Sequence, residues 1–134
     1  DMEKNDSPLR GGNEKILLID DEHSILKVQQ RILEHLGYDV TIENKSESAM
    51  EMIEKNPKGF DLVITDMSMP KMDGATLAQK AMQINPDLPV IICTGFSSVL
   101  TREKIRELGI RAVLSKPLSV QVLTSEIRKI LDSN

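Results

Sequence analysis

The sequence is poor in cysteine, histidine and aromatic residues, and each shortage excludes a class of site. Cys93 has no second cysteine with which to form an internal disulfide, and one cysteine with two histidines cannot supply the four ligands of a structural zinc site. Two phenylalanines, one tyrosine and no tryptophan leave little on which the bases of single-stranded nucleic acid could stack. We therefore expect a protein of a reducing compartment, the cytoplasm, in which Cys93 is a small buried residue of a strand.

Long apolar runs and an excess of positive charge are also missing. The longest apolar runs, residues 16–19 and 90–93, have four residues each, whereas a membrane-spanning helix needs about 20 and the apolar region of a signal peptide about 7 to 15. The 17 basic and 21 acidic residues give a net charge of −4, which argues against the basic surface of a nucleic-acid-binding protein. We expect this domain to contact neither membrane nor nucleic acid.

The pattern along the chain predicts a polar head followed by one folded domain. Residues 1–14 are polar, with a proline and a glycine pair and no periodicity, and are typical of a linker or tail. From residue 15 to residue 134, short apolar runs alternate with longer stretches of helical period, which is typical of βα units and a parallel sheet. A chain of 134 residues has room for one such domain and no second core.

Five strand–helix units are predicted. The strands are expected at residues 15–20, 38–42, 60–65, 88–93 and 111–114. The third strand is a continuous apolar run, so it should be buried on both faces at the centre of the sheet. The first helix is expected to bury Ile25, Val28, Ile32 and Leu36, and the last helix Val120, Leu123, Ile127 and Leu131. The fourth helix, residues 97–108, contains a long charged stretch and should be the least firmly packed.

Polar residues follow four of the predicted strands. Asp20 and Asp21 follow the first, Asp66 the third, Thr94 the fourth and Lys116 the fifth. Because open α/β sheets bind their ligands at the carboxyl ends of parallel strands, we expect these side chains to meet at one edge. No glycine pattern of a dinucleotide-binding or P-loop site accompanies them, so nucleotide binding is not supported.

The types of these residues indicate a metal-assisted phosphoryl site. Three converging carboxylates repel one another unless a cation compensates them, and hard oxygen ligands favour Mg²⁺ over a transition metal. The formal charges of three carboxylates, one Mg²⁺ and the Lys116 ammonium cancel. Such a site offers a nucleophilic carboxylate, a metal and an ammonium for phosphoryl oxygens, and a hydroxyl donor at Thr94.

Four segments of the sequence resemble the receiver domain of bacterial two-component signalling. They are ILLIDDE at residues 16–22, DLVITDMSMPKMDG at 61–74, VIICTG at 90–95 and SKPL at 115–118. The resemblance implies an α/β fold, a doubly wound five-stranded parallel sheet of order 2-1-3-4-5 flanked by five helices, as in flavodoxin. It covers residues 15–132, and the joint spacing of the four segments is specific, whereas any one alone would be weak.

The resemblance also assigns roles to residues. It makes Asp66 the phosphoacceptor, places Mg²⁺ on Asp20, Asp21, Asp66 and the backbone carbonyl of Ser68, and brings Thr94 and Lys116 to the phosphoryl group. It implies a cis Lys116–Pro117 bond and a histidine kinase or phosphotransfer domain as partner. The domain would at most hydrolyse its own phosphoaspartate. The sequences CTGFS and KPL are similar to those of receivers attached to hybrid sensor histidine kinases. Such a kinase is therefore one expected parent chain.

Two alternatives stay open, and one position departs from the family pattern. A Mg²⁺-dependent phosphohydrolase with an aspartyl nucleophile needs a second acid two residues further on, where this chain has Ser68; a scaffold receiver would normally have lost part of the site.

Val113 occupies the place where receivers often carry Tyr or Phe. We therefore expect a small rearrangement on phosphorylation, triggered by Thr94 and carried mainly by the loop around Phe96 and Ser97.

Overall fold

A parallel five-stranded sheet forms the centre of the molecule. The computed structural model describes residues 9–95 and 102–133. The strands are β1 (Lys15–Ile19), β2 (Asp39–Glu43), β3 (Leu62–Asp66), β4 (Val90–Thr94) and β5 (Ala112–Ser115). They pair in parallel in the order β2-β1-β3-β4-β5, which confirms the order expected from the sequence. This order reverses direction between β1 and β3, so the crevice beside their carboxyl ends is where such a sheet binds ligands.

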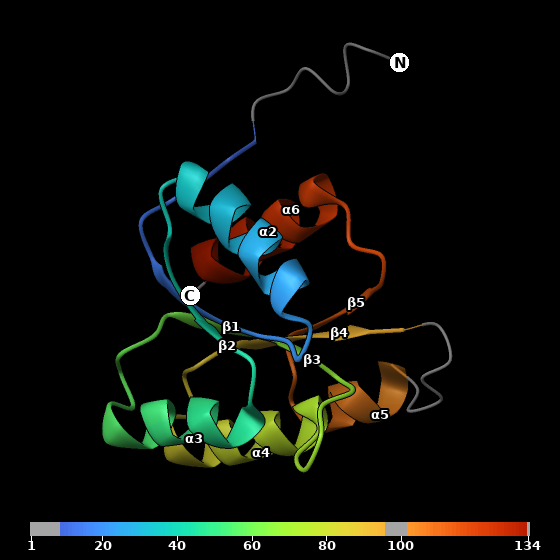
Figure 1. The fold of residues 1–134 in the computed structure, drawn as a ribbon. Coiled ribbons are helices and arrows are strands. Elements are labelled where there is room, and N and C mark those ends of the chain that lie inside the picture. Colours follow the sequence, from blue (N-terminus) through green and yellow to red (C-terminus); the bar gives the residue numbers. More distant parts are fainter. Residues whose placement is uncertain (1–8, 96–101, 134) are drawn as a thin grey trace.

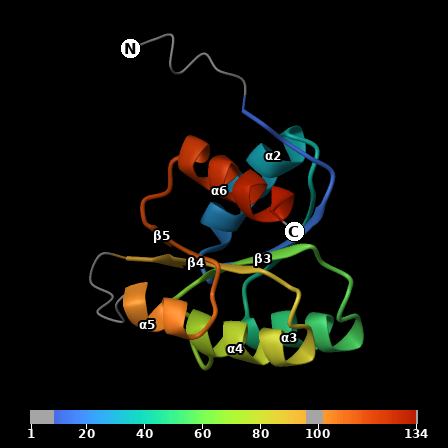
Figure 2. The same ribbon diagram turned by 180° about the vertical axis from the view of Figure 1, so that it is seen from behind.

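Five helices within the described ranges cover the two faces of the sheet. They are α2 (His23–His35), α3 (Ser46–Lys55), α4 (Gly74–Ile84), α5 (Arg102–Glu107) and α6 (Val120–Asp132). Helices α2 and α6 lie on one face, and α3, α4 and α5 lie on the other (Figures 1 and 2). None of these helices is long and apolar enough to cross a membrane.

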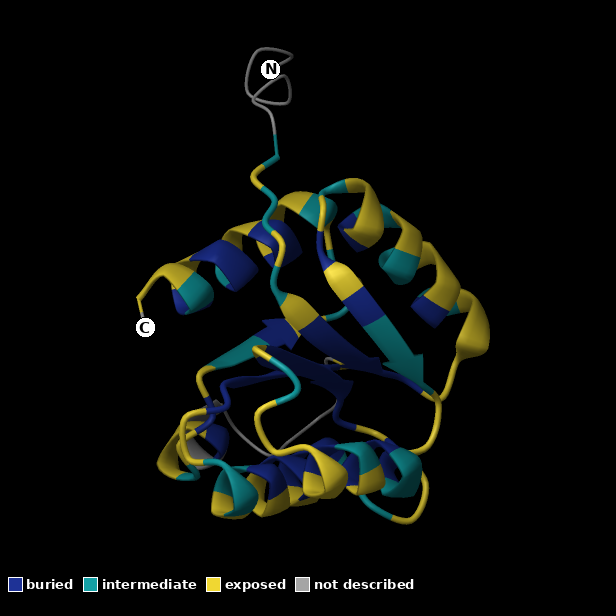
Figure 3. Cartoon of the chain, turned by 90° about the vertical axis from the view of Figure 1, so that its left-hand side faces the viewer, coloured by how far each residue is buried: buried dark blue, intermediate teal, exposed yellow. Residues whose placement is uncertain are grey.

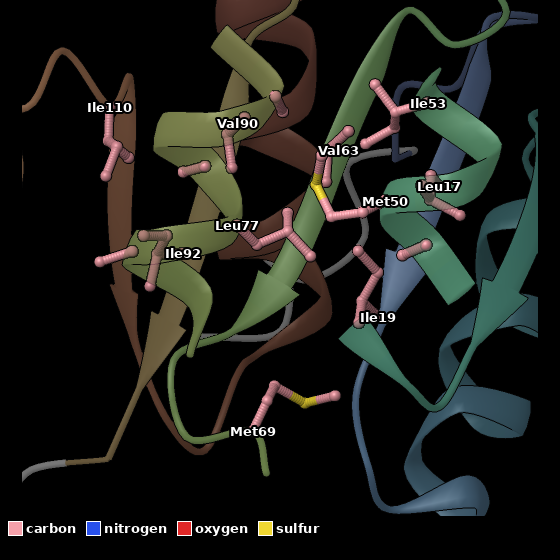
Figure 4. Packing of buried hydrophobic residues seen from close by; sticks show 14 of the residues in the cluster. Leu17, Ile19, Met50, Ile53, Val63, Met69, Leu77, Val90, Ile92 and Ile110 are labelled. Carbon is pink, nitrogen blue, oxygen red and sulfur yellow. The ribbon is translucent and has the colours of Figure 1, made fainter. Parts of the chain in front are cut away.

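Each face of the sheet has its own hydrophobic core, because successive residues of a strand point to opposite sides. In β1, Ile16 and Leu18 join the core under α2 and α6, whereas Leu17 and Ile19 join the core under α3, α4 and α5 (Figure 4). All five residues of β3 are buried, which confirms the predicted central strand. Figure 3 shows exposed outer faces on the helices and buried residues at the centre of the sheet, whereas the edge strands β2 and β5 are partly exposed. The site is therefore carried on a sheet that is covered on both sides.

The four strands after β1 each end one residue beyond the predicted limit. Asp66 and Thr94 are the last residues of β3 and β4, not the residues that follow them. The ladder continues because Asp66 pairs with Cys93 and Thr94 pairs with Ser115. Both polar side chains are thus held by regular strand geometry and not by a loop.

The prediction for the first helix selected the wrong apolar row. Helix α2 buries Leu26 and Leu33, whereas the Val28 side chain, expected in the core, is 58% exposed. The sequence has apolar residues in two neighbouring rows of this helix, and periodicity alone does not show which row faces the sheet. The outer row, which includes Ile25 and Ile32, is left near the surface between α2 and α6.

The last helix buries a charged residue that was not expected inside. Leu123 and Ile127 are buried as predicted, whereas Val120 and Leu131 are half-buried. Between them Arg128 is only 9% exposed. The predicted fourth helix is described from Arg102 to Glu107, and its expected first residues, 97–101, lie outside the described part of the chain.

The described residues before β1 contact the domain. The Gly12 amide donates a hydrogen bond of 3.2 Å to the carbonyl of Leu36, at the end of α2. The Arg128 guanidinium donates to both carboxylate oxygens of Glu14 and to the carbonyl of Gly11. Residues 11–14 therefore bridge α2 and α6 at the amino-terminal side of β1.

Candidate functional site

Three carboxylates meet at the carboxyl edge of the sheet, as the strand ends predict. Asp20 and Asp21 directly follow β1, and Asp66 ends the neighbouring β3. One carboxylate oxygen from each lies within 4.8 Å of the others. Asp20 and Asp66 are 5% and 8% exposed, whereas Asp21 is exposed. The Glu22 amide donates a 3.0 Å hydrogen bond to Asp20 Oδ1, which fixes the first of these carboxylates against the start of α2.

The Lys116 ammonium lies between two of these carboxylates. Its Nζ atom is 3.0 Å from Asp66 Oδ1 and 3.2 Å from Asp20 Oδ2. The Lys116 amide donates a 2.8 Å hydrogen bond to the carbonyl of Thr94, so the backbone after β5 is tied to the end of β4. The Lys116–Pro117 peptide bond is cis, which confirms the prediction. One cation is thus built into the acidic pocket.

Burial and neighbouring charge change the acidity of this pair. Burial raises the pKa of Asp66 above its usual value; Lys116 opposes the rise, and the charges of Asp20 and Asp21 add to it. Burial alone would lower the pKa of Lys116, but its hydrogen bond to Asp66 and the charge of Asp20 raise it. The rise at Asp66 therefore comes mainly from burial, with the two like charges adding to it, whereas the rise at Lys116 comes from two carboxylates that outweigh burial.

Thr94 and Ser68 lie at the same edge. Thr94 is 8% exposed at the end of β4, beside β3 and β5. Ser68 is exposed in the loop that follows Asp66. The side-chain contacts described here join Asp20, Asp66 and Lys116; strand register and chain connectivity place Thr94 and Ser68 close by. The expected response loop around Phe96 and Ser97 lies outside the described residues.

The carboxylate group fits a hard divalent cation. Its potential ligand atoms are carboxylate oxygens only, which suit Mg²⁺ and do not suit the nitrogen and sulfur preference of structural zinc. Within residues 9–95 and 102–133 it is the single group of three or more potential metal-ligating side chains. The position of Lys116 beside two of the acids gives a site in which phosphoryl oxygens can also be neutralised.

An apolar groove that the sequence did not predict opens beside this pocket. It has a volume of about 710 Å³ and is bordered by Gly95 and Lys116 at the site end. Its apolar lining comes from α2, from the segment after β5 and from α6: Ile25, Val28, Ile32, Pro117, Leu118 and Leu123. The signal in the sequence is the second apolar row of the first helix, Ile25, Val28 and Ile32, which faces this groove and not the core. The groove therefore reaches Lys116, whose ammonium contacts Asp66.

Comparisons with known proteins agree with this geometry. The model of the family described as response regulator receiver domain matches residues 16–128. The chain is 38% identical over 117 residues to the response regulator receiver protein CpdR of Brucella abortus (strain 2308), an alignment that covers 87% of this chain and 96% of CpdR. It is 34% identical over 119 residues to the transcriptional regulatory protein ZraR of Escherichia coli O157:H7, but that alignment covers 26% of ZraR.

Solved structures share the whole fold. A response regulator receiver domain protein from Clostridium thermocellum superposes with a TM-score of 0.85 at 32% identity, over 90% of this chain and 95% of that one. A CheY-like response regulator receiver domain protein from Methanospirillum hungatei JF-1 gives a TM-score of 0.84 at 30% identity, over 91% and 96% of the two chains. The similarity therefore includes the strands that carry the acidic pocket.

Proposed function

This chain belongs to the response regulator receiver domain family, and we propose that it is a switch in which Asp66 accepts a phosphoryl group from a phosphohistidine. The observation that carries the proposal is the Asp66 carboxylate held 3.0 Å from the Lys116 ammonium, with Asp20 and Asp21 beside it. A buried carboxylate next to a fixed ammonium has both the nucleophile and the counter-charge that phosphoryl transfer requires.

The proposed step uses residues of this edge alone. A carboxylate oxygen of Asp66 forms a bond to phosphorus as the phosphorus–nitrogen bond of the phosphohistidine breaks, and the imidazole of the donor takes the electron pair. The Lys116 ammonium pairs with a phosphoryl oxygen, and the Thr94 hydroxyl donates to another. Asp20, Asp21, Asp66 and the carbonyl of Ser68 would hold Mg²⁺, which when bound neutralises charge on the phosphoryl oxygens.

The two alternatives are less well supported. Ser68 stands two residues after Asp66, where a phosphohydrolase of the haloacid dehalogenase type needs a second acid. A scaffold that is never phosphorylated could bind its partner without any of these charged side chains. It would not need an ammonium at Lys116 between the carboxylates of Asp20 and Asp66. The complete set of acids, ammonium and hydroxyl therefore favours the phosphoacceptor.

The groove between α2 and α6 supports a protein as the donor. Phosphoryl transfer from a phosphohistidine brings the surface around that histidine against the rim of the Asp66 pocket. The groove starts at this rim, since Gly95 and Lys116 border it, and the Val28 side chain on its wall is 58% exposed. We propose that an apolar surface of a histidine kinase or phosphotransfer domain fills it.

The parent chain and the compartment stay predictions. This chain covers 96% of CpdR but 26% of ZraR, so relatives of this domain include proteins of very different length. A hybrid sensor histidine kinase as parent and a cytoplasmic location are the expectations from the sequence.

Phosphorylation with a small donor tests the proposal without the partner. The chain is incubated with acetyl phosphate and Mg²⁺, and its intact mass is measured for the wild type, for Asp66→Asn and for Asp87→Asn, an exposed acid between α4 and β4. We expect one added phosphoryl group on the wild type and on Asp87→Asn and none on Asp66→Asn. Equal labelling of Asp66→Asn and the wild type would show that another residue is the acceptor.

A further inference from the structure

The first residue of α3 contacts the loop that follows Asp66. The Ser46 side chain is fully buried, at 0% exposure, and its hydroxyl donates a 2.8 Å hydrogen bond to the carbonyl of Met72, which lies 26 positions further along the chain. A serine at a helix start usually caps its own helix. Here the N-cap residue is Lys45, which makes no side-chain capping bond. The Ser46 hydroxyl does not cap α3 and binds the carbonyl of Met72 in a distant loop.

The loop at residues 67–73 has backbone hydrogen bonds at both ends and one buried side chain in its middle. Met69 is 8% exposed and joins the core under α3, α4 and α5 (Figure 4). At the start of the loop, the Met67 amide donates to the carbonyl of Cys93 at 2.8 Å. At its end, the Gly74 amide donates to the carbonyl of Met67 at 2.8 Å, and the Asp73 carboxylate caps α4. Near its tip, Lys71 has a left-handed backbone with φ of 70°. Among the described residues, the bond from Ser46 is the buried hydrogen bond that joins α3 to the later part of this loop.

A second contact joins the same two segments from the outside. Lys71 Nζ lies 3.5 Å from Glu47 Oε2, with the lysine side chain 79% exposed. An ion pair this exposed stabilises weakly, because solvent screens it. The buried hydroxyl of Ser46 is not screened in this way. If the half-buried carbonyl of Met72 loses this donor, it must recruit water or move.

We infer that Ser46 is a positioning residue for the site: it fixes the loop that brings the Ser68 carbonyl to Asp20 and Asp66. Its hydroxyl touches neither the acids nor a phosphoryl group, so it acts through the loop. This inference deepens the proposed function and rests on it, because Ser68 matters only if its carbonyl binds Mg²⁺. Loss of the hydroxyl should allow the loop to adopt other positions. The backbone carbonyl of Ser68 would then bind Mg²⁺ more weakly.

The test is Mg²⁺ binding by variants of two serines of α3. Ser46→Ala removes the donor, whereas the matched control Ser48→Ala removes a half-buried hydroxyl that has no partner among the described residues. Calorimetric titration with MgCl₂ gives the affinity, and thermal melting in EDTA shows whether each variant is folded. We expect Ser46→Ala to bind Mg²⁺ about three- to tenfold more weakly, the effect of losing one hydrogen bond. Ser48→Ala should bind like the wild type.

A kinetic readout separates positioning from general destabilisation. The rate of phosphorylation by acetyl phosphate is measured over a range of MgCl₂ concentrations; saturating MgCl₂ should restore the rate of Ser46→Ala to that of the wild type. If Ser46→Ala fails to fold, Ser46→Cys, which keeps the volume and donates only weakly, takes its place. Wild-type affinity in the folded Ser46 variant, or an equal loss in Ser48→Ala, would overturn the inference. A wild type that binds no Mg²⁺ would instead overturn the proposed function.

Discussion

Arg128 and Glu14 form a two-pronged ion pair between α6 and the residue before β1. Nη1 lies 2.8 Å from Oε1, and Nη2 lies 3.0 Å from Oε2. Planar guanidinium and carboxylate groups in this arrangement form the strongest class of side-chain ion pair. The phenolic oxygen of Tyr38 and the carboxylate of Asp132 accept further hydrogen bonds from the same guanidinium, so its buried charge is fully paired.

Glu14→Gln should destabilise the domain. The amide keeps the shape of the side chain but loses its charge and one of its two acceptors, so the free energy of unfolding should fall by about 1 to 2 kcal/mol. Urea unfolding at pH 7, followed by circular dichroism, measures the change. Glu51→Gln, at an exposed position of α3, is the control and should unfold like the wild type. Equal stability of Glu14→Gln and the wild type would mean that the ion pair contributes nothing.

The same pair predicts a pH dependence. The hydrogen bond from Arg128 lowers the pKa of Glu14 below its ordinary value of 4.5. A carboxylate whose pKa is lowered in the folded state stabilises above its unfolded pKa, and this stabilisation is lost as the pH falls through the folded value. The difference in stability between wild type and Glu14→Gln should therefore be constant from neutral pH to about one unit above 4.5 and shrink below it. A difference that grows on acidification would contradict this sign.

Gly74→Ala should disturb the phosphoacceptor strand directly. A Cβ atom at this position would lie 2.6 Å from the carbonyl oxygen of Asp66 and 3.0 Å from the Cα of Met67. Both neighbours are backbone atoms, so the end of β3 must shift. We expect a loss of about 1 to 3 kcal/mol in unfolding free energy and slower phosphorylation by acetyl phosphate. Gly95→Ala, where the added atom has no atom of the described residues within 4 Å, is the control.

Asp21→Asn should make the metal-free domain slightly more stable. Asp21 is exposed and its charge opposes ionisation of Asp66, whereas the Lys116 ammonium contacts Asp20 and Asp66. Removing this charge relieves repulsion, and we expect a gain of about 0.5 kcal/mol in EDTA. Asp20→Asn should bring less benefit because it also weakens the partner of Lys116. A clear loss of stability in Asp21→Asn, measured by urea unfolding in EDTA, would argue against a crowded acidic pocket.

Val28→Glu should block the protein donor but not the small one. The new carboxylate would lie in the groove between α2 and α6, where the proposed apolar contact forms. The donor in this test is the phosphohistidine protein that phosphorylates the wild type fastest. Its phosphotransfer to Val28→Glu should slow about tenfold or more. Labelling by acetyl phosphate should be unchanged. Val122→Glu is a matched control, since Val122 is 50% exposed on α6 and does not line the groove. An equal effect of both variants would locate the contact elsewhere.

The fold and the strand-end residues could be predicted because both follow from local pattern. The short apolar runs determine the strands. The parallel sheet then brings Asp20, Asp66 and Lys116 to one edge, independently of the conformation of the loops. The buried face of α2 could not be predicted in the same way, because two apolar rows compete for it. Nor could the pair of Arg128 with Glu14, since a contact between distant residues leaves no periodic signal in a single sequence.

Ser46 shows a further limit of sequence reasoning. A serine before an apolar run is read as a helix cap, and its real partner, the carbonyl of Met72, belongs to a loop whose path depends on the folded sheet.

The burial of Cys93 makes the chain ready for site-selective labelling. Its thiol is 3% exposed in β4, and burial raises its pKa to about 12, so thiol reagents at neutral pH should leave it unmodified while the domain is folded. A second cysteine introduced by Val28→Cys would then be the single reactive thiol of the native molecule. A fluorophore attached there would lie on the wall of the groove and report donor docking in real time, with no native residue of the core removed.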